Sequence, residues 1–311
     1  MNALLANRVV AAPVAAPPGH WIGAGGSMIM ESDKRTGAAR KHYIGMVTML
    51  DVLAHIAGDH GGELDQKLQV PVSSIIGQCV ESLSLWTLSC NTDITDCMEV
   101  FSKGIHRALV PVDSQLENIS GVELVDSASS YRMVTQMDLL NFLKAHQHEL
   151  RDILERPVSG IGAVSDIVFG VSDKTNVIEA IKCMNGASLN AVPILESTND
   201  IVEDHGQLIS GKDRKLVATF STTDLRGCPM PLLQSCLHLN VMDFINRLSN
   251  STKDLVTCRT ESLLGEVLDK VVNNHVHRAW VVDELGLLVG LISLTDIIRV
   301  TRVWLLSEAY D

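Results

Sequence analysis

The 311-residue chain lacks the features that mark several large classes of protein. Its seven cysteines include no Cys-x-x-Cys pair, so we expect reduced thiols in the cytoplasm or nucleus, not a disulfide framework or a zinc site. It has no uninterrupted apolar run of about eighteen residues, which predicts that no helix crosses a membrane. Its net charge of −12 argues against nucleic acid or an anionic membrane as partner, because both require a basic surface.

Motifs of catalysis and of metal binding are missing as well. The chain contains no Gly-x-Ser-x-Gly, no Gly-x4-Gly-Lys-Ser/Thr and no His-Glu-x-x-His. Two His-x-His pairs, at 146–148 and 275–277, have no third ligand type clustered with them. We therefore expect a protein that is not an enzyme and that holds no metal or cofactor. The apolar N-terminal stretch 3–16 has no basic residue before it, which favours a part of the fold over a secretory signal.

What the chain does contain is a Ser/Thr-x-x-Asp motif that occurs four times. The copies begin at Thr48, Thr135, Ser221 and Ser293, and they end at Asp51, Asp138, Asp224 and Asp296. Each copy follows a strand-like apolar run and precedes a helix-like one. This regular recurrence indicates one structural unit used four times, with a carboxylate presented at the same corner of each unit.

The rest of each unit reads as strand, helix, strand, strand, helix. The second strands are predicted at 11–14, 109–112, 191–194 and 279–282, and the third at 43–47, 131–134, 216–220 and 287–292. A first strand is predicted at 85–88, 167–171 and 254–258, whereas the first unit starts inside its helix (2–6) and is incomplete. Long polar connections (15–41, 114–130 and 196–215) contrast with a tight turn at 283–286. One unit of about 60 residues buries too little surface to stand alone, so the units should pair.

The stretch 274–298, with His277 and Arg278 ahead of a strand and Ser293 to Asp296 behind it, resembles the last repeat of the gamma regulatory subunit of AMP-activated and sucrose-non-fermenting-related protein kinases. Residues 105–107 resemble its second-repeat counterpart, and the long Gly-rich insertion is most similar to the plant gamma-like subunits. The resemblance implies an α/β fold of four cystathionine-β-synthase (CBS) repeats, at about 1–58, 82–147, 164–228 and 252–305. These would form two pairs, or Bateman modules, at 1–150 and 158–311, with the boundary at 157–162.

The resemblance also implies sites for an adenine nucleotide (AMP, ADP or ATP). It assigns ribose to the four aspartates Asp51, Asp138, Asp224 and Asp296, and phosphate in a central channel to His106, Arg107, His277 and Arg278. The hydroxyls of Thr48, Thr135, Ser221, Ser293 and Thr295 would donate to ribose or phosphate. The chemistry is suitable, because a carboxylate accepts charge-assisted bonds from a diol and the planar fork of Arg matches phosphate.

Structural roles explain part of the same pattern. Ser/Thr-x-x-Asp is also a variant of the helix capping box, which stabilises by about 0.5–2 kcal/mol, with about 0.3–1 kcal/mol more from the helix dipole. Both roles can coexist, because the cap uses the hydroxyl and leaves carboxylate lone pairs free. His-Arg pairs at helix ends would likewise complement the dipole.

Three repeats depart from the pattern of the family. The phosphate-binding Arg position falls on Val10 in the first repeat, with Arg8 two residues earlier, and the third repeat offers no cation at 188–190. An extra residue between Arg107 and Pro111 could rotate the second His-Arg pair. The sites at Asp296 and Asp224 therefore rank above those at Asp51 and Asp138.

The leading hypothesis is a non-catalytic gamma-type subunit that binds AMP, ADP or ATP and joins a catalytic alpha subunit of a kinase to a beta scaffold subunit. One alternative is a nucleotide-independent scaffold whose aspartates only cap helices. Another is a CBS-pair regulator of a different enzyme or of a transporter.

Overall fold

A computed structural model describes residues 4, 6–7, 9–15, 41–58, 64–79, 82, 85–111, 125–126, 131–197, 206–228, 230–248 and 255–308. Most of the predicted insertions at 15–41 and 114–130 lie outside these residues, as do Arg8 and part of the predicted helix 2–6. Within the described ranges no helix is long and apolar enough to cross a membrane.

The first two repeats follow the predicted order of elements. Repeat 1 contains β1 (Ala11–Ala15), β2 (Lys41–Thr48) and α2 (Met49–Ala57), and α3 (Leu64–Lys67) and the 3-10 turn η1 (Val72–Ser74) connect it to repeat 2. Repeat 2 contains β3 (Trp86–Thr87), α4 (Ile94–Ser102), β4 (Arg107–Pro111), β5 (Val125–Asp126), β6 (Tyr131–Thr135) and α5 (Gln136–Ala145). The short helix α6 (Arg151–Leu154) leads out of it.

The last two repeats follow the same order with one exception. Repeat 3 contains β7 (Phe169–Ser172), α7 (Val177–Gly186), β8 (Ala191–Leu195), β9 (Ile209–Ser210), β10 (Leu216–Ser221), η4 (Asp224–Gly227), α8 (Met230–Leu237) and α9 (Val241–Leu248). Repeat 4 contains β11 (Thr257–Cys258), α10 (Leu264–Asn273), β12 (Arg278–Val282), β13 (Leu288–Ser293) and α11 (Leu294–Glu308). The exception corrects the prediction that an α-helix follows every motif, because only the 3-10 turn η4 starts at Asp224.

Each repeat builds a small mixed sheet. The strands before and after the variable connection pair antiparallel (β1 with β2, β4 with β6, β8 with β10, β12 with β13). The first strand pairs parallel with the second in repeats 2 to 4. The predicted tight turn is confirmed between β12 and β13, where Gly286 has a φ of +77° and its N–H donates to the carbonyl of Asp283.

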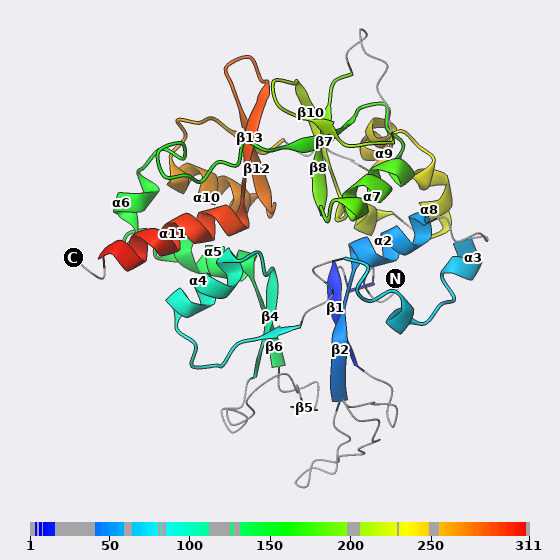
Figure 1. Cartoon of the computed structure of the whole chain (residues 1–311), viewed down its shortest axis with the longest axis horizontal. Helices are drawn as coiled ribbons and strands as arrows, with labels where there is room; N and C mark the ends of the chain where they lie inside the picture. The colour runs from blue at the N-terminus through cyan, green and yellow to red at the C-terminus, as the bar shows by residue number, and fades with distance from the viewer. Residues whose placement is uncertain are drawn as a thin grey trace.

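Two hydrophobic cores join repeats that are not consecutive in the sequence. The first core combines α2 of repeat 1 with α7 and α9 of repeat 3, through fully buried side chains such as Leu53, Ile181 and Phe244. The second combines α4 and α5 of repeat 2 with α10 and α11 of repeat 4, through Phe101 and Ile297 among others. Burial of each such side chain contributes about 1.5–3 kcal/mol. In Figure 1 these cores lie on opposite sides of a flattened molecule, with the sheets between them.

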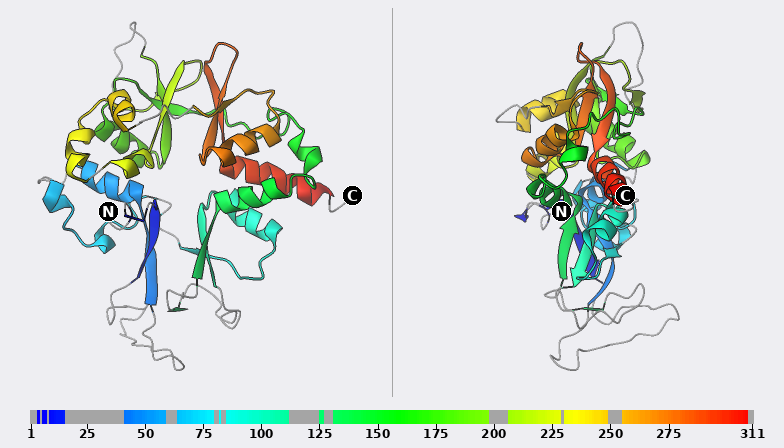
Figure 2. Two further views of the ribbon diagram at one scale, coloured as in Figure 1. Left: turned by 180° about the vertical axis from the view of Figure 1, so that it is seen from behind. Right: turned by 90° about the vertical axis from the view of Figure 1, so that its left-hand side faces the viewer.

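The sheets of repeats 3 and 4 are also joined directly. The indole N–H of Trp280 on β12 donates to the hydroxyl of Thr219 on β10 over 2.7 Å, and Trp280 is only 2% exposed. A smaller core that includes Trp280 and Leu288 fills the space between the two sheets. Repeats 1 and 2 meet through the pairing of β2 with β5. The repeats therefore close into a ring, which Figure 2 shows edge-on in its right-hand view.

The stretch 157–162, where we predicted the boundary between the two pairs, lies against repeat 4. The N–H of Val158 donates to the carbonyl of Ser262 over 3.0 Å, and Val158 is fully buried. The division into two pairs stays a prediction, but this stretch is not a free linker.

Candidate functional site

Three of the four motifs are capping boxes with nearly the same geometry. In repeat 1, the N–H and hydroxyl of Thr48 donate to Oδ2 of Asp51 over 2.7 and 2.6 Å, and the N–H of Asp51 donates back to the hydroxyl over 3.2 Å. In repeat 2, Thr135 and Asp138 make the same three bonds at 2.9, 2.7 and 3.2 Å. Ser293 and the last aspartate repeat them at 3.0, 2.5 and 3.2 Å. The helix cap is therefore a real role of the motif in repeats 1, 2 and 4.

The third motif has a different geometry. The N–H of Ser221 donates to Oδ2 of Asp224 over 2.8 Å, but the Ser221 hydroxyl lies 3.0 Å from the hydroxyl of Thr223. Thr223 has αR backbone angles, and its side chain makes no cap hydrogen bond. This local geometry accompanies the 3-10 turn that takes the place of the expected helix.

The carboxylates of the three capping boxes differ mainly in Oδ1, the oxygen that the cap does not use. Asp138 is exposed, and Oδ1 of Asp296 forms an ion pair with Arg299 at 3.3 Å. Asp51 is fully buried, and its Oδ1 accepts from the N–H of Cys79 over 2.9 Å and from the hydroxyl of Ser82 over 2.8 Å. A ribose could reach Asp51 only by displacing these donors. The assignment of ribose to the four aspartates stays a prediction.

The strand register fixes where the phosphate-binding arginines can lie. Arg107, the first residue of β4, is opposite Thr135, and Arg278, the first residue of β12, is opposite Ser293. Both arginines therefore begin strands, and neither belongs to the end of a helix as we expected. Because the two registers agree, the extra residue between Arg107 and Pro111 does not rotate the second pair.

The same register corrects the alignment of the other two repeats. Ala11 is opposite Thr48 in repeat 1, and Ala191 is opposite Ser221 in repeat 3. Ala11, and not Val10, is thus the equivalent of the two arginines. Repeats 1 and 3 have alanine where repeats 2 and 4 have a cation.

His106 of repeat 2 lies near enough to Arg278 of repeat 4 for the charge of the arginine to act on it. Burial lowers the pKa of both Arg107 and Arg278 to about 10, below the ordinary 12.5. Burial, and then the positive charge of Arg278, lowers the pKa of His106 below its usual value of 6.5. The charge of Arg278 thus acts on the pKa of His106 across two repeats. We predicted that these two side chains would share a channel. His277 is exposed.

Arg278 is held by neutral groups. Its Nη1 donates to the carbonyl of Ala191 over 2.9 Å, and its guanidinium carbon lies 5.8 Å from the centre of the Trp280 ring. In the described part of the chain no carboxylate is within ion-pair distance of Arg278. Such a cation keeps capacity for an anion, since the guanidinium has five N–H donors.

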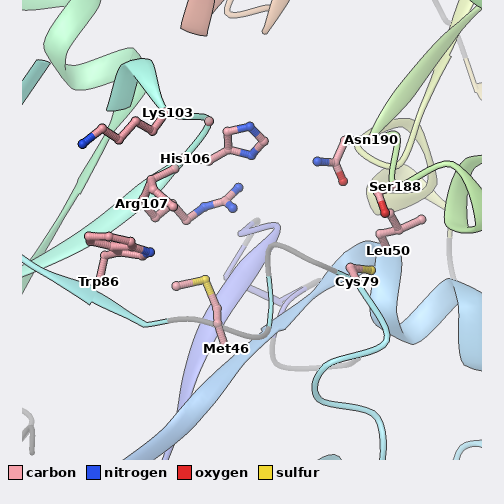
Figure 3. A pocket seen from close by; sticks show the side chains of 11 residues that line it. Met46, Leu50, Cys79, Trp86, Lys103, His106, Arg107, Ser188 and Asn190 are labelled. Atoms are coloured by element: carbon pink, nitrogen blue, oxygen red, sulfur yellow. The ribbon is translucent and has the colours of Figure 1, made fainter. Parts of the chain in front are cut away.

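A cavity of about 330 Å³ opens beside His106 and Arg107 and is lined by repeats 1, 2 and 3. Figure 3 shows the side chains of His106 and Arg107 on one wall, pointing toward Asn190 on the other, with Trp86 below the arginine. Lys103 lines the same cavity, but its ammonium group points away. Small-molecule sites typically have about 300–1,000 Å³, so this cavity is of a suitable size.

Several lining residues were not found from the sequence. They share no motif and come from a strand, a connection and a helix end; they are Met46, Leu50, Cys79, Trp86 and Lys103. A single sequence signal was available for Trp86, because the chain is only 4% aromatic and has four tryptophans, one of which falls in the strand predicted at 85–88. Thr295, which we predicted as a contact to the ligand, accepts from the side-chain amide of Gln136 over 2.8 Å, and so also joins repeats 2 and 4.

Comparison with known proteins gives consistent relatives along the whole chain. The model of the CBS domain family matches residues 245–302. The chain is 56% identical to the SNF1-related protein kinase regulatory subunit gamma-like PV42a of Arabidopsis thaliana, over 97% of this chain and 88% of the relative. It is 53% identical to PV42b of the same plant, over 100% and 90%. A solved structure from Methanocaldococcus jannaschii, a protein likened to the gamma subunit of AMPK, superposes with a TM-score of 0.61 at 17% identity, over 95% of this chain and 89% of that one.

Proposed function

The chain belongs to the family of gamma-like regulatory subunits of SNF1-related protein kinases, and we propose that it regulates its kinase by binding AMP, ADP or ATP at the centre of the ring. Its role in this family is regulatory and non-catalytic. The phosphates would bind at Arg107, which lines the cavity of about 330 Å³ with His106, and at Arg278, whose charge acts on His106.

The observation that carries this proposal is the shared register of the two arginines. Each begins a strand opposite the Ser or Thr of a capping box, so repeats 2 and 4 both place one cation beside the same corner. Two desolvated guanidinium groups raise the local positive potential and favour an anion with more than one charge, such as a phosphate ester. Trp86 offers an aromatic face next to Arg107 on which a base could stack.

Isothermal titration with AMP, ADP and ATP tests this proposal. We expect Arg107→Gln and Arg278→Gln each to weaken binding by about 10–150-fold, because a hydrogen bond to a charged group contributes about 1.5–3 kcal/mol. Arg132→Gln is the matched control, since Arg132 is an exposed cation on β6 of the same repeat and does not line the cavity. Wild-type protein that binds none of the three nucleotides would support the scaffold that works without nucleotide.

We further propose that the subunit assembles with a catalytic alpha subunit and a beta scaffold subunit, in the cytoplasm or nucleus. The plant relatives support the kinase partnership, and the seven cysteines, none of which forms a disulfide, support a reducing compartment. Co-purification from plant cells with a tagged chain, followed by mass spectrometry, tests the assembly. Recovery of a transporter or metabolic enzyme in stoichiometric amount, without a kinase, would contradict it.

A further inference from the structure

The carboxylate of Asp51 already has the partners that a ribose would supply. Its cap-facing oxygen, Oδ2, is bound by Thr48, as in the equivalent aspartates of repeats 2 and 4. Its other oxygen, Oδ1, accepts two hydrogen bonds from the chain itself, from the N–H of Cys79 (2.9 Å) and from the hydroxyl of Ser82 (2.8 Å). Two donors on the outward side of an acceptor are what the two hydroxyls of a ribose diol would present.

These donors belong to one segment of the chain. It comprises residues 77–79 and Ser82, and we call it the corner segment. The Ser82 hydroxyl accepts from the N–H of Gly77 over 2.9 Å and also lies 2.8 Å from the carbonyl of Cys79. Ser82 is fully buried and Cys79 is 5% exposed. Burial, and then the negative charge of Asp51, raises the pKa of Cys79 to about 12, which keeps its thiol protonated.

Strand β2 leaves space for the corner segment at Gly45. Gly45 on β2 has no side chain where a Cβ would stand 2.8 Å from Ile76 Cγ2 and 3.4 Å from the carbonyl oxygen of Ser82. The segment also reaches repeat 3, because the Cys79 thiol lies 3.9 Å from Oδ1 of Asn185 on α7. Independent contacts with repeats 1 and 3 therefore hold the corner segment in place.

The other capping boxes show that this occupancy is particular to repeat 1. Asp138 has the same bonds to its cap, yet its side chain is exposed. Oδ1 of Asp296 forms an ion pair with Arg299, an exposed residue of the same helix, at 3.3 Å. Among the described residues, a segment from outside the helix covers the carboxylate of a capping box only at Asp51.

We propose that the corner segment is a built-in substitute for a ribose diol, which closes the nucleotide corner of repeat 1 and leaves the sites of the protein to the other repeats. This inference rests on the proposed function, in that a nucleoside is the ligand that the corner would otherwise take. Asp51 then holds the connection between repeats 1 and 2 in place and does not contact the nucleotide.

Two measurements on the full chain test this inference, with the variants Asp51→Asn and Ser82→Ala and with Asp138→Asn as the matched control. The first is hydrogen exchange of the Cys79 amide without nucleotide, followed by NMR. We expect exchange to be at least about tenfold faster in both corner variants and unchanged in the control, because Asp51 anchors this amide. Exchange that stays the same in Ser82→Ala and Asp51→Asn would overturn the inference.

The second measurement is the number of AMP molecules bound per chain, by isothermal titration. We expect Asp51→Asn to keep the wild-type number, and the loss of one bound AMP in this variant would overturn the inference. Ser82→Ala removes a single donor and leaves the capping box intact, so it keeps the exchange test available if Asp51→Asn does not fold. If no variant and no wild-type protein binds AMP, the proposed function fails, while the exchange experiment still decides whether Asp51 holds the corner segment.

Discussion

Trp280 should contribute to the stability of the ring of repeats and to nucleotide binding through two separate contacts. Its hydrogen bond to Thr219 joins the sheets of repeats 3 and 4 over 2.7 Å, and the ring of Trp280 also lies under the guanidinium of Arg278. Thr219→Val removes the hydrogen bond and keeps the indole ring next to Arg278. Trp280→Phe also removes the hydrogen bond, and it replaces the indole ring by a phenyl ring. The two variants therefore separate the two roles of one side chain.

The structure sets the expected magnitudes. A buried hydrogen bond between neutral groups contributes about 1 kcal/mol, so Thr219→Val should lower the free energy of unfolding by about that amount. Trp280 is 2% exposed, so Trp280→Phe leaves a cavity where the missing ring atoms were, which costs on the order of 1 kcal/mol. Together with the lost hydrogen bond, Trp280→Phe should lower the free energy of unfolding by about 2 kcal/mol. At about 2 °C for each kcal/mol in a chain of this size, the melting temperature should fall by about 2 and 4 °C.

Calorimetry of the wild type, both single variants and the double variant gives the coupling energy. Because the bond can be lost only once, the double variant should cost about 2 kcal/mol instead of 3, which is a coupling of about 1 kcal/mol. Titration with AMP should show affinity unchanged in Thr219→Val and about two- to fivefold weaker in Trp280→Phe, since a cation–π contact contributes about 0.5–1 kcal/mol. Strictly additive stabilities, or equal affinities in both variants, would refute this reasoning.

Two further predictions concern packing and pH. Gly290→Ala should destabilise by about 1–3 kcal/mol, because a Cβ there would stand 2.6 Å from the carbonyl oxygen of Ser165, whereas Gly186→Ala near the end of α7 has open space and should be neutral or stabilising in chemical denaturation. The folded-state pKa of His106 is below 6.5, so the unfolded chain takes up its proton first and stability should fall as the pH drops below 6.5. His106→Asn should lose less stability between pH 7 and 5 in thermal melts, and an identical loss would contradict this assignment.

The repeat pattern was predictable because each repeat obeys local rules. Alternating apolar residues placed the strands within a few residues of their observed bounds, and Gly286 marked the tight turn. Thr48 and Thr135 were recognisable as caps, since a capping box is contained in four consecutive residues. The third motif starts a 3-10 turn and no α-helix, and there the hydroxyls of Ser221 and Thr223 lie 3.0 Å apart.

The site was less predictable, because its geometry depends on contacts between distant residues. The partners of Asp51 at Cys79 and Ser82 are 28 and 31 residues further along the chain, and no spacing rule connects them to the motif. The equivalence of Ala11 with Arg107 follows from the strand register, which the sequence alone does not fix. The cavity joins residues of three repeats, so its lining became visible only once those repeats were packed together.

The crossed packing of the two cores bears on how the chain can be divided. A cut at 157–162 would separate repeats 1 and 2 from repeats 3 and 4, and it would leave each fragment with one half of both cores. The fragment with repeats 1 and 2 would expose apolar faces of α2 and α5, and the fragment with repeats 3 and 4 would expose apolar faces of α7 and α10. The exposed faces of the two fragments are complementary. Two fragments produced in the same cell should therefore recombine into one particle, and either fragment alone should aggregate.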